Sequence, residues 1–357
     1  MEEALTFDDV LLIPQYSEIL PSEVCLETQL SPCQPLAIPI LSAAMDSVTE
    51  TSMAIGMAKV GGLGIIHKNM TIDEQSLCVK TCKANAPGAP IGAAIGIGES
   101  VERASTLVQA GVDVLVIDTA HAHSKTVLDT AKQIKNLFPE KILIVGNIVT
   151  GEAAICLAKV GVDAVKVGIG PGSICTTRII SGVGYPQITA IMSVAKALKK
   201  TPITIIADGG MRYSGDIVKA LAAGADCVML GGMLAGTEEA PGEVIYIDEK
   251  AYKMYRGMGS VAAMKQGSAD RYFQKQKERK FVPEGVEGLV PFKGSINDVL
   301  YQILGGLRSG MGYLGARTLK ELKEQAIFTR ISQSGRAESH IHNLQYVKNT
   351  PNYSITT

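Results

Sequence analysis

The segment 168–178, GIGPGSICTTR, places a single cysteine directly after a glycine-rich turn. Cys175 follows Ser173 and Ile174 and precedes Thr176, so its thiol has hydroxyl neighbours. Three interpretations are open at this stage. Cys175 is a nucleophile that attacks an electrophilic carbon, or the loop binds a phosphate or an ion through its backbone, or the segment is only a tight turn after a buried strand.

Two glycine pairs follow apolar runs later in the chain. Gly209 and Gly210 end the run ITIIADGG, and Gly231 and Gly232 end the run DCVMLGG. Tight turns would explain both pairs, but glycine also lets backbone N–H groups reach a phosphate at the ends of barrel strands. Asp208, just before the first pair, adds a carboxylate that accepts hydrogen bonds from ribose hydroxyls. The pattern therefore predicts a site for a nucleotide monophosphate.

The segment SADRYFQ (268–274) sets Arg271 beside Tyr272. The reference pKa of arginine is about 12 or higher, which makes it a poor base. Composition alone therefore favours a surface arginine that binds an anion.

Neither a histidine pair nor a cysteine pair completes a metal site. His121 and His123 alternate after an apolar run, but a bound metal needs at least a third ligand. Cys78 and Cys82 lie four residues apart on a predicted helix, where packing explains them. We expect no metal at either pair.

The elements that must position these residues are short apolar runs bounded by glycine or proline. Near-continuous runs of Val, Ile, Leu and Ala are typical of parallel strands, which are buried on both faces. Eight such runs occur, at 37–45, 61–67, 91–97, 112–118, 141–147, 163–169, 203–210 and 226–232.

Helical stretches lie between these runs, and the junction from helix to strand repeats as AGVD (110–113), VGVD (160–163) and AGAD (223–226), with VGGLG (60–64) as a looser copy. A glycine just past a helix end suits a left-handed residue. The first strand ends in SAAMDSV rather than in a dinucleotide-binding glycine motif. We therefore predict an α/β fold, a (β/α)₈ barrel, with chemistry at the carboxyl ends of its strands.

The bulk composition excludes several classes of protein. The chain has 357 residues, of which 46% are hydrophobic and 19% charged, and its formal net charge is −1. A nucleic-acid partner is not expected without a basic excess, and no apolar run is long enough to span a membrane. With no secretory signal at the N-terminus and seven unpatterned cysteines, we expect a cytoplasmic location and reduced thiols.

A long polar segment follows the eighth predicted strand. Residues 233–300 are rich in Gly, Lys, Arg and Tyr and show little apolar periodicity. A segment of this kind inside a compact domain is usually a functional lid or a disordered loop. We define the lid segment as residues 254–295, within a single catalytic domain of residues 1–357.

The motifs together resemble the IMP dehydrogenase/GMP reductase family, and most closely its IMP dehydrogenases. The resemblance runs in order through LTFDDVLL, HKNMTI, GIGPGSICTTR, GVGYPQ, IADGGMRYSGD, MLGGMLAGTEEAPGE, YRGMGSVAAM, DRYFQ, VPEGVEG and GGLRSGMGYLGA. It implies a (β/α)₈ barrel that oxidises IMP to XMP with NAD⁺ in guanine nucleotide biosynthesis. It also implies a homotetramer that a monovalent cation, K⁺, activates.

The resemblance also implies the catalytic roles. Cys175 matches the nucleophile that attacks C2 of the purine, so that hydride passes to nicotinamide and a covalent thioimidate remains. Water then hydrolyses this intermediate. Arg271 matches the unusual base for that water, with Tyr272 beside it, and Thr177 matches a threonine that helps to hold the water. The family role thus replaces the surface interpretation of Arg271.

Binding roles follow from the same resemblance. The residues matched to IMP contacts are Ser173, Asp208, Gly210, Gly231, Gly232, Tyr255, Gly257, Met258, Gly259 and Glu284. Those matched to the NAD site are Asp118, Asn147, Gly168 and Gly170. Carbonyl groups matched to the K⁺ site belong to Gly170, Gly172 and Cys175, and to Glu338, Ser339 and His340 of a neighbouring subunit.

One departure and two alternatives remain. The family usually inserts a pair of nucleotide-binding regulatory modules, the CBS pair, where KANAPGAP (83–90) here joins a helix directly to a strand. Allosteric control by nucleotides is therefore not predicted. The nearest alternative function is GMP reductase, which deaminates GMP with NADPH and lacks the Arg–Tyr lid, and a further one is a non-catalytic nucleotide-binding protein. The motif DRYFQ and the lid at 264–295 argue against the reductase, which shares the cysteine loop. Intact Cys175, Thr177, Arg271 and Tyr272 argue against a non-catalytic protein.

Overall fold

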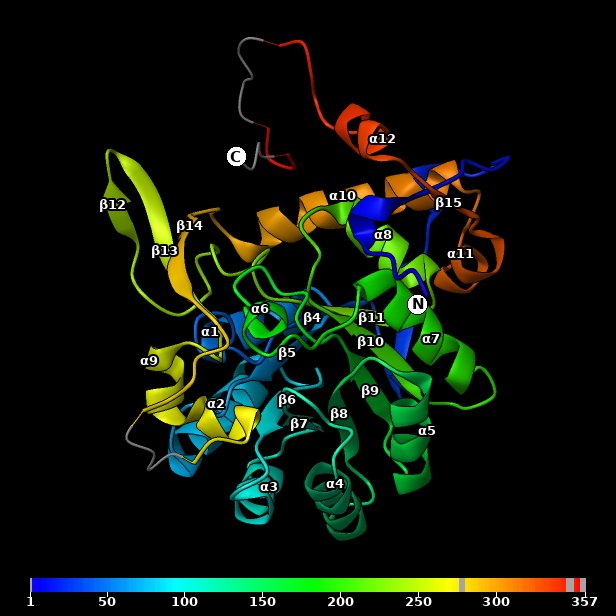
Figure 1. Ribbon diagram of the computed structural model, residues 1–357. Coiled ribbons are helices and arrows are strands. Elements are labelled where there is room, and N and C mark those ends of the chain that lie inside the picture. Colours follow the sequence, from blue (N-terminus) through cyan, green and yellow to red (C-terminus); the bar gives the residue numbers. More distant parts are fainter. Residues whose placement is uncertain (1, 276–279, 345–349, 354–357) are drawn as a thin grey trace.

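Eight parallel strands close into a barrel at the centre of the computed structural model, which describes residues 2–275, 280–344 and 350–353 (Figure 1). Each strand pairs with the next along the chain, and the last pairs with the first through Val228 and Ile40. The strands are β4 (Ile40–Ser42), β5 (Leu63–Ile66), β6 (Gly92–Ile95), β7 (Val114–Asp118), β8 (Ile142–Ile148), β9 (Ala164–Val167), β10 (Thr204–Asp208) and β11 (Cys227–Leu230).

Helices follow the strands in alternation and surround the barrel (Figure 1). They are α1 (Thr51–Lys59), α2 (Ile72–Asn85), α3 (Ser100–Gln109), α4 (Lys125–Leu137), α5 (Gly151–Val160), α7 (Gln187–Leu198), α8 (Ser214–Ala222) and α10 (Ile296–Tyr313). Seven of the eight predicted apolar runs contain a barrel strand in full, and the run 141–147 contains all of β8 except Ile148, so the predicted (β/α)₈ barrel is confirmed.

The repeated junctions have the conformation that their glycines predict. Gly61, Gly111, Gly161 and Gly224 all have positive φ, between 81° and 117°. This region of backbone space is open to glycine at little cost and lets the chain turn sharply from a helix into a strand.

The aspartate that ends each repeat ties two neighbouring strands together, and we call Asp113, Asp163 and Asp226 the strand-start aspartates. Each accepts a hydrogen bond, at 2.8 Å, from the backbone N–H at the start of the preceding strand, that of Ile91, Leu143 or Ile205. Each carboxylate also pairs with a lysine, Lys83, Lys135 or Lys323. The looser copy of the repeat has Leu63 in place of this aspartate.

A hairpin of β2 (Thr28–Ser31) and β3 (Gln34–Leu36) packs against one end of the barrel. Leu30 and Leu36 join the cluster of side chains that fills the barrel interior, which includes Leu41, Ile65 and Val116. The hydroxyl of Thr28 donates to the carbonyl oxygen of Asp226, which precedes β11, so the hairpin covers the amino-terminal end of the strands. The hairpin does not cover the opposite, carboxyl-terminal end of the strands, where polar residues such as Asp118, Asn147 and Asp208 lie.

The segment between β11 and α10 contains regular structure that the sequence did not predict. An antiparallel sheet of β12 (Ile245–Ile247), β13 (Lys250–Arg256) and β14 (Glu287–Pro291) projects from the barrel (Figure 1). The expectation of a lid or a disordered loop was incomplete because β12 and β14 are largely exposed and β13 buries a lysine and a tyrosine, Lys253 and Tyr255, so these strands lack an apolar run. A short helical part, α9 (Val261–Ala263) and the turns of residues 264–272, lies between β13 and β14.

Among the described residues, no helix combines the length and the apolar character that crossing a membrane requires.

Candidate active site

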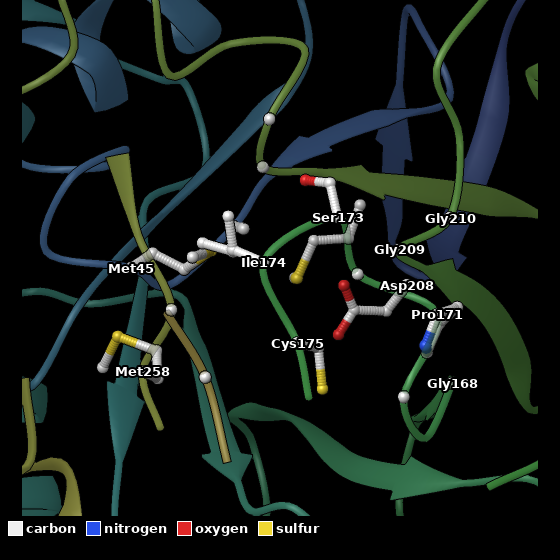
Figure 2. A pocket seen from close by; sticks show the side chains of 18 of the residues that line it. Met45, Gly168, Pro171, Ser173, Ile174, Cys175, Asp208, Gly209, Gly210 and Met258 are labelled. Atoms are coloured by element: carbon white, nitrogen blue, oxygen red, sulfur yellow. The ribbon is translucent and has the colours of Figure 1, made fainter. Parts of the chain in front are cut away.

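A cavity of about 530 Å³ opens at the carboxyl-terminal ends of the barrel strands. Its wall contains nearly every site residue that the sequence analysis singled out. These are Asp118, Asn147, Gly168, Gly170, Gly172, Ser173, Cys175, Thr177, Asp208, Gly210, Gly231, Gly232, Tyr255, Gly257, Met258, Gly259, Arg271, Tyr272 and Glu284. Ser173, Cys175 and Asp208 surround one space, with Met45 and Met258 across it in Figure 2.

The cysteine loop follows β9 and is held from the lid side. The thiol of Cys175 lies 3.2 Å from Thr177 Oγ1. The backbone of the loop pairs with the strand that leads into β14, since Thr176 N donates to Glu284 O at 2.9 Å and Val286 N donates to Ile174 O at 3.0 Å. The loop that carries the cysteine is thus one strand of a local ladder.

Cys175 differs from the buried cysteines in its surroundings. Burial raises the pKa of both Cys82 and Cys227 to about 12, so these two side chains remain neutral thiols. Cys175 instead faces the cavity beside a hydroxyl. Among these three cysteines it alone is placed to meet a ligand.

One end of the cavity gathers hydroxyls and glycines. Burial raises the pKa of Tyr255 to about 12, although hydrogen bonds with the Ser173 side chain and the Gly232 backbone act in the opposite direction. Gly209 and Gly210 face this end with φ of 88° and 85°. Neutral hydroxyl donors beside accessible backbone N–H groups form a surface that suits a phosphate.

Next to this end, Asp208 is the last residue of β10 and Asn147 the penultimate residue of β8. Asn147 Nδ2 donates to Asp208 Oδ2 at 2.9 Å and to the carbonyl oxygen of Gly168 at 2.6 Å. A carboxylate that is oriented in this way can accept hydrogen bonds from the hydroxyls of a sugar.

Lys166 was missed by the sequence analysis. It lies in β9, is 1% exposed, and reaches Asp118, Asn147 and Asp208 together. The signal was present, because a lysine interrupts the otherwise apolar run DAVKVGI. A charged side chain on a strand that is buried on both faces must find partners of opposite charge.

The lid segment enters the cavity through Arg271. Its guanidinium pairs with the Asp118 carboxylate at the end of β7, and its carbonyl oxygen accepts a hydrogen bond of 2.9 Å from Ala120 N. Burial acts to raise the pKa of Asp118, but the charges of Arg271 and Lys166 lower it well below its ordinary value. Asp118 is therefore ionised, and its carboxylate forms an ion pair with Arg271 of the lid segment.

Tyr272 lies beside Arg271 and near the cysteine. Burial raises the pKa of its phenol to about 12, the charge of Arg271 acts to lower it, and Cys175 acts to raise it. The phenol is neutral at physiological pH and can both donate and accept a hydrogen bond.

The lid has a second contact with the barrel rim. Lys68, which follows β5, pairs with Asp270 and donates to the carbonyl oxygen of Gly267 at 2.9 Å. Arg256 at the end of β13 binds the Asp46 carboxylate through two hydrogen bonds of 2.9 Å. The lid segment is thus attached to loops at the strand ends at two places, near its start through Arg256 and further along through Gly267 and Asp270.

The three residues that the resemblance assigned to a neighbouring subunit do not line the cavity. Glu338 ends the short helix α12 (Gln333–Glu338), and Ser339 Oγ donates to the carbonyl oxygen of Gly335 at 2.9 Å. The His340 ring lies 3.1 Å, through Nδ1, from the hydroxyl of Tyr353. Within one chain these residues are not brought to the carbonyl groups of Gly170, Gly172 and Cys175.

No group of three or more His, Cys, Asp or Glu side chains suited to a metal ion occurs among the described residues.

Comparison with known proteins places this site in a family. A family model described as "IMP dehydrogenase / GMP reductase domain" matches residues 4–342. The chain belongs to the IMP dehydrogenase/GMP reductase family. The matched range contains the barrel, the cysteine loop and the lid segment.

Two curated relatives match nearly the whole chain, and both are named inosine-5'-monophosphate dehydrogenase. The protein from Cryptosporidium parvum is 50% identical over 394 positions, which span 99% of this chain and 98% of the relative. That from Aquifex aeolicus is 44% identical over 483 positions, 99% and 98% of the two chains. This second alignment spans 483 positions, whereas this chain has 357 residues, so the chain is shorter than the Aquifex aeolicus relative.

Proposed function

We propose that the protein oxidises IMP to XMP with NAD⁺ through a covalent intermediate on Cys175. The observation that carries the proposal is that Arg271 and Tyr272 line the same cavity as Cys175 and Thr177. Oxidation alone needs only the nucleophile and a hydride acceptor, whereas the second pair of residues suits a hydrolysis step. The names of the relatives agree with this activity.

In the first step, Cys175 Sγ loses its proton and adds to C2 of the purine. The hydrogen on C2 then leaves with its electron pair to the nicotinamide of NAD⁺, which becomes NADH. IMP is held at the phosphate end by Ser173, Gly210, Gly231, Gly232 and Tyr255, at the ribose by Asp208, and at the base by Gly257, Met258, Gly259 and Glu284. NAD⁺ lies toward Asp118, Asn147, Gly168 and Gly170.

In the second step, water attacks C2 of the thioimidate, its proton goes to the base, and the C–S bond breaks to release XMP and the thiolate. We assign the base role to Arg271, and the positioning of the water to Thr177 and Tyr272. Burial acts to lower the pKa of Arg271, but Asp118 raises it overall. Arg271 is therefore protonated in this ion pair, and it can take the proton from water only after the pair separates and the guanidinium has released a proton to solvent.

The two steps use Asp118 in turn. Arg271 occupies this carboxylate in the structure, where we also place the nicotinamide ribose. Lys166 and Arg271 already bind one oxygen each of this buried carboxylate, so we infer that NADH leaves before the lid closes. We accordingly treat residues 254–295 as a mobile lid within a single catalytic domain, residues 1–357, that lacks the regulatory insertion near 83–90.

The proposed function predicts which substrate pair gives a signal. IMP with NAD⁺ should raise the absorbance of NADH, whereas GMP with NADPH should leave the absorbance unchanged. The reason is that Arg271 and Tyr272 suit a hydrolysis step, and a GMP reductase has no such step. The two assays are run on the same protein preparation, with heat-treated protein as the control. Consumption of NADPH with GMP, and no response to IMP, would establish the reductase alternative instead.

We also propose that K⁺ binds the carbonyl oxygens of Gly170, Gly172 and Cys175. Neutral backbone oxygens suit a hard monovalent cation, and the loop is already curved, since Cys175 N donates to Gly172 O at 3.1 Å. Glu338, Ser339 and His340 of a neighbouring subunit would complete the shell in a homotetramer. When bound, the ion would hold the shape of the cysteine loop.

Replacing K⁺ by Li⁺ tests this site. Because the smaller ion does not fit carbonyl groups spaced for K⁺, steady-state turnover should fall at least about tenfold. Light scattering on the same samples should give the mass of four chains in both salts. Equal turnover in both salts would rule out the cation site, and a monomer that is active and K⁺-dependent would rule out donation of ligands by a neighbouring subunit.

A cytoplasmic location and the absence of a nucleic-acid partner stay predictions.

A further inference from the structure

A buried lysine lies at the centre of the site and has no part in the proposed chemistry. Lys166 Nζ is 2.9 Å from Asp118 Oδ1 and 2.6 Å from Asp208 Oδ2, and it donates to Asn147 Oδ1 as well. An ammonium group has three N–H donors. Two of them form hydrogen bonds, to Asn147 Oδ1 and Asp208 Oδ2, and Asp118 Oδ1 forms an ion pair with the ammonium. Lys166 lines the cavity, but all three of these contacts go to neighbouring side chains, through which it acts.

The position of Lys166 is built into the barrel. Gly146, its partner on β8, leaves the room that the lysine needs, since a Cβ at Gly146 would lie 2.5 Å from the Cβ of Lys166. The lysine is flanked on β9 by Val165 and Val167, both fully buried. An ammonium in such surroundings is stable only beside compensating carboxylates.

The charges at this point nearly balance. Asp118 and Asp208 contribute two negative charges, and Lys166 contributes one positive charge. Arg271 adds a second positive charge when the lid is closed, through Asp118 Oδ2, the carboxylate oxygen that Lys166 does not bind. Without Lys166, two carboxylates would share a buried site, and one of them would rotate away or take up a proton.

We propose that Lys166 is a positioning residue that orients two carboxylates at once, Asp208 toward the substrate ribose and Asp118 toward either the dinucleotide or the lid. This inference rests on the proposed function. Its consequence is that one side chain couples the IMP site at Asp208 to the dinucleotide and lid site at Asp118. Losing it should weaken IMP binding, NAD⁺ use and thioimidate hydrolysis together, although Lys166 binds none of the reacting groups.

Three measurements on Lys166→Met test the proposal, since methionine keeps the length and removes the charge. The dissociation constant of IMP reports on Asp208, the KM for NAD⁺ on Asp118, and the rate of XMP release after the NADH burst on Arg271. The dissociation constant and the KM should rise, and the rate should fall, by about ten- to hundredfold. Losses of this size are expected when a hydrogen bond to a charged group is removed. Lys166→Arg keeps the charge and should restore all three at least partly.

Lys253→Met is the matched control. Lys253 is 2% exposed and lies outside the cavity wall, where it donates to the carbonyl oxygens of Thr237, Glu238 and Ala240. Its loss should lower the melting temperature but change the three constants less than about threefold. If Lys166→Met only lowers the melting temperature in the same way, the positioning role is overturned.

A double-mutant cycle with Asp118→Asn separates positioning from a direct contact. If Lys166 acts on NAD⁺ through Asp118, adding Lys166→Met to Asp118→Asn should raise the KM for NAD⁺ by less than about threefold further. Fully additive effects would overturn the inference. If the wild-type protein oxidises no IMP, the proposed function fails, but IMP affinity in Lys166→Met still tests the orientation of Asp208.

Discussion

Cys175→Ala should abolish turnover of IMP and leave IMP binding nearly intact. Alanine removes the only atom that can form the covalent bond to C2, so kcat should fall at least about a thousandfold. We propose other residues, such as Ser173, Asp208 and Glu284, for the phosphate, ribose and base contacts, so the dissociation constant of IMP should change less than about threefold. Steady-state NADH formation and calorimetric titration with IMP give the two values.

Cys156→Ala provides the control for this variant. Cys156 is a half-buried cysteine on α5 and does not line the cavity, so its loss should leave both values unchanged. A folded Cys175→Ala protein that no longer binds IMP, or one that turns over at the normal rate, would contradict the nucleophile role.

Arg271→Ala should separate the two chemical steps. Hydride transfer needs Cys175 and NAD⁺ but not the lid, so NADH should appear as a single burst of about one equivalent per active site. Hydrolysis loses its base, and steady-state turnover should fall by about 10²- to 10⁴-fold. Rapid mixing followed by absorbance at the NADH band measures the burst and the slow phase in one trace.

The same variant has a second expected outcome. Loss of Arg271 leaves Asp118 without its lid partner, so the dinucleotide no longer competes for this carboxylate. The KM for NAD⁺ should therefore stay equal or fall while kcat falls, a split that general unfolding would not produce. Arg330→Ala, which removes an exposed arginine paired with Glu3, serves as control. Normal steady-state turnover in Arg271→Ala would exclude the base role.

The barrel could be predicted from the sequence because its signals are local. Each strand is a run of apolar residues, and each junction has a glycine and, in three of four copies, an aspartate whose backbone partner lies on the preceding unit. The cavity residues at the strand ends, such as Asp208 and the cysteine loop, could be found by the same logic. Their catalytic roles came from the family resemblance and not from spacing.

What could not be predicted depends on contacts between distant segments. Nothing near Arg271 in the sequence indicates that it pairs with Asp118, since the lid reaches this carboxylate only when the chain has folded around the barrel. The sheet of β12, β13 and β14 was missed because β12 and β14 are largely exposed and only one face of β13 is buried. Lys166 could have been found, since a lysine in a doubly buried strand requires anionic partners.

The strand-start aspartates have a consequence for the order in which the barrel can form. Each links backbone positions only 20 to 22 residues apart along the chain, so the loop that it closes is short. The final closure joins Ile40 to Val228, nearly the full span of the barrel sequence. Because loop-closure entropy rises with the length of the loop, the local strand pairs cost less to form than the closure that completes the barrel and its active site.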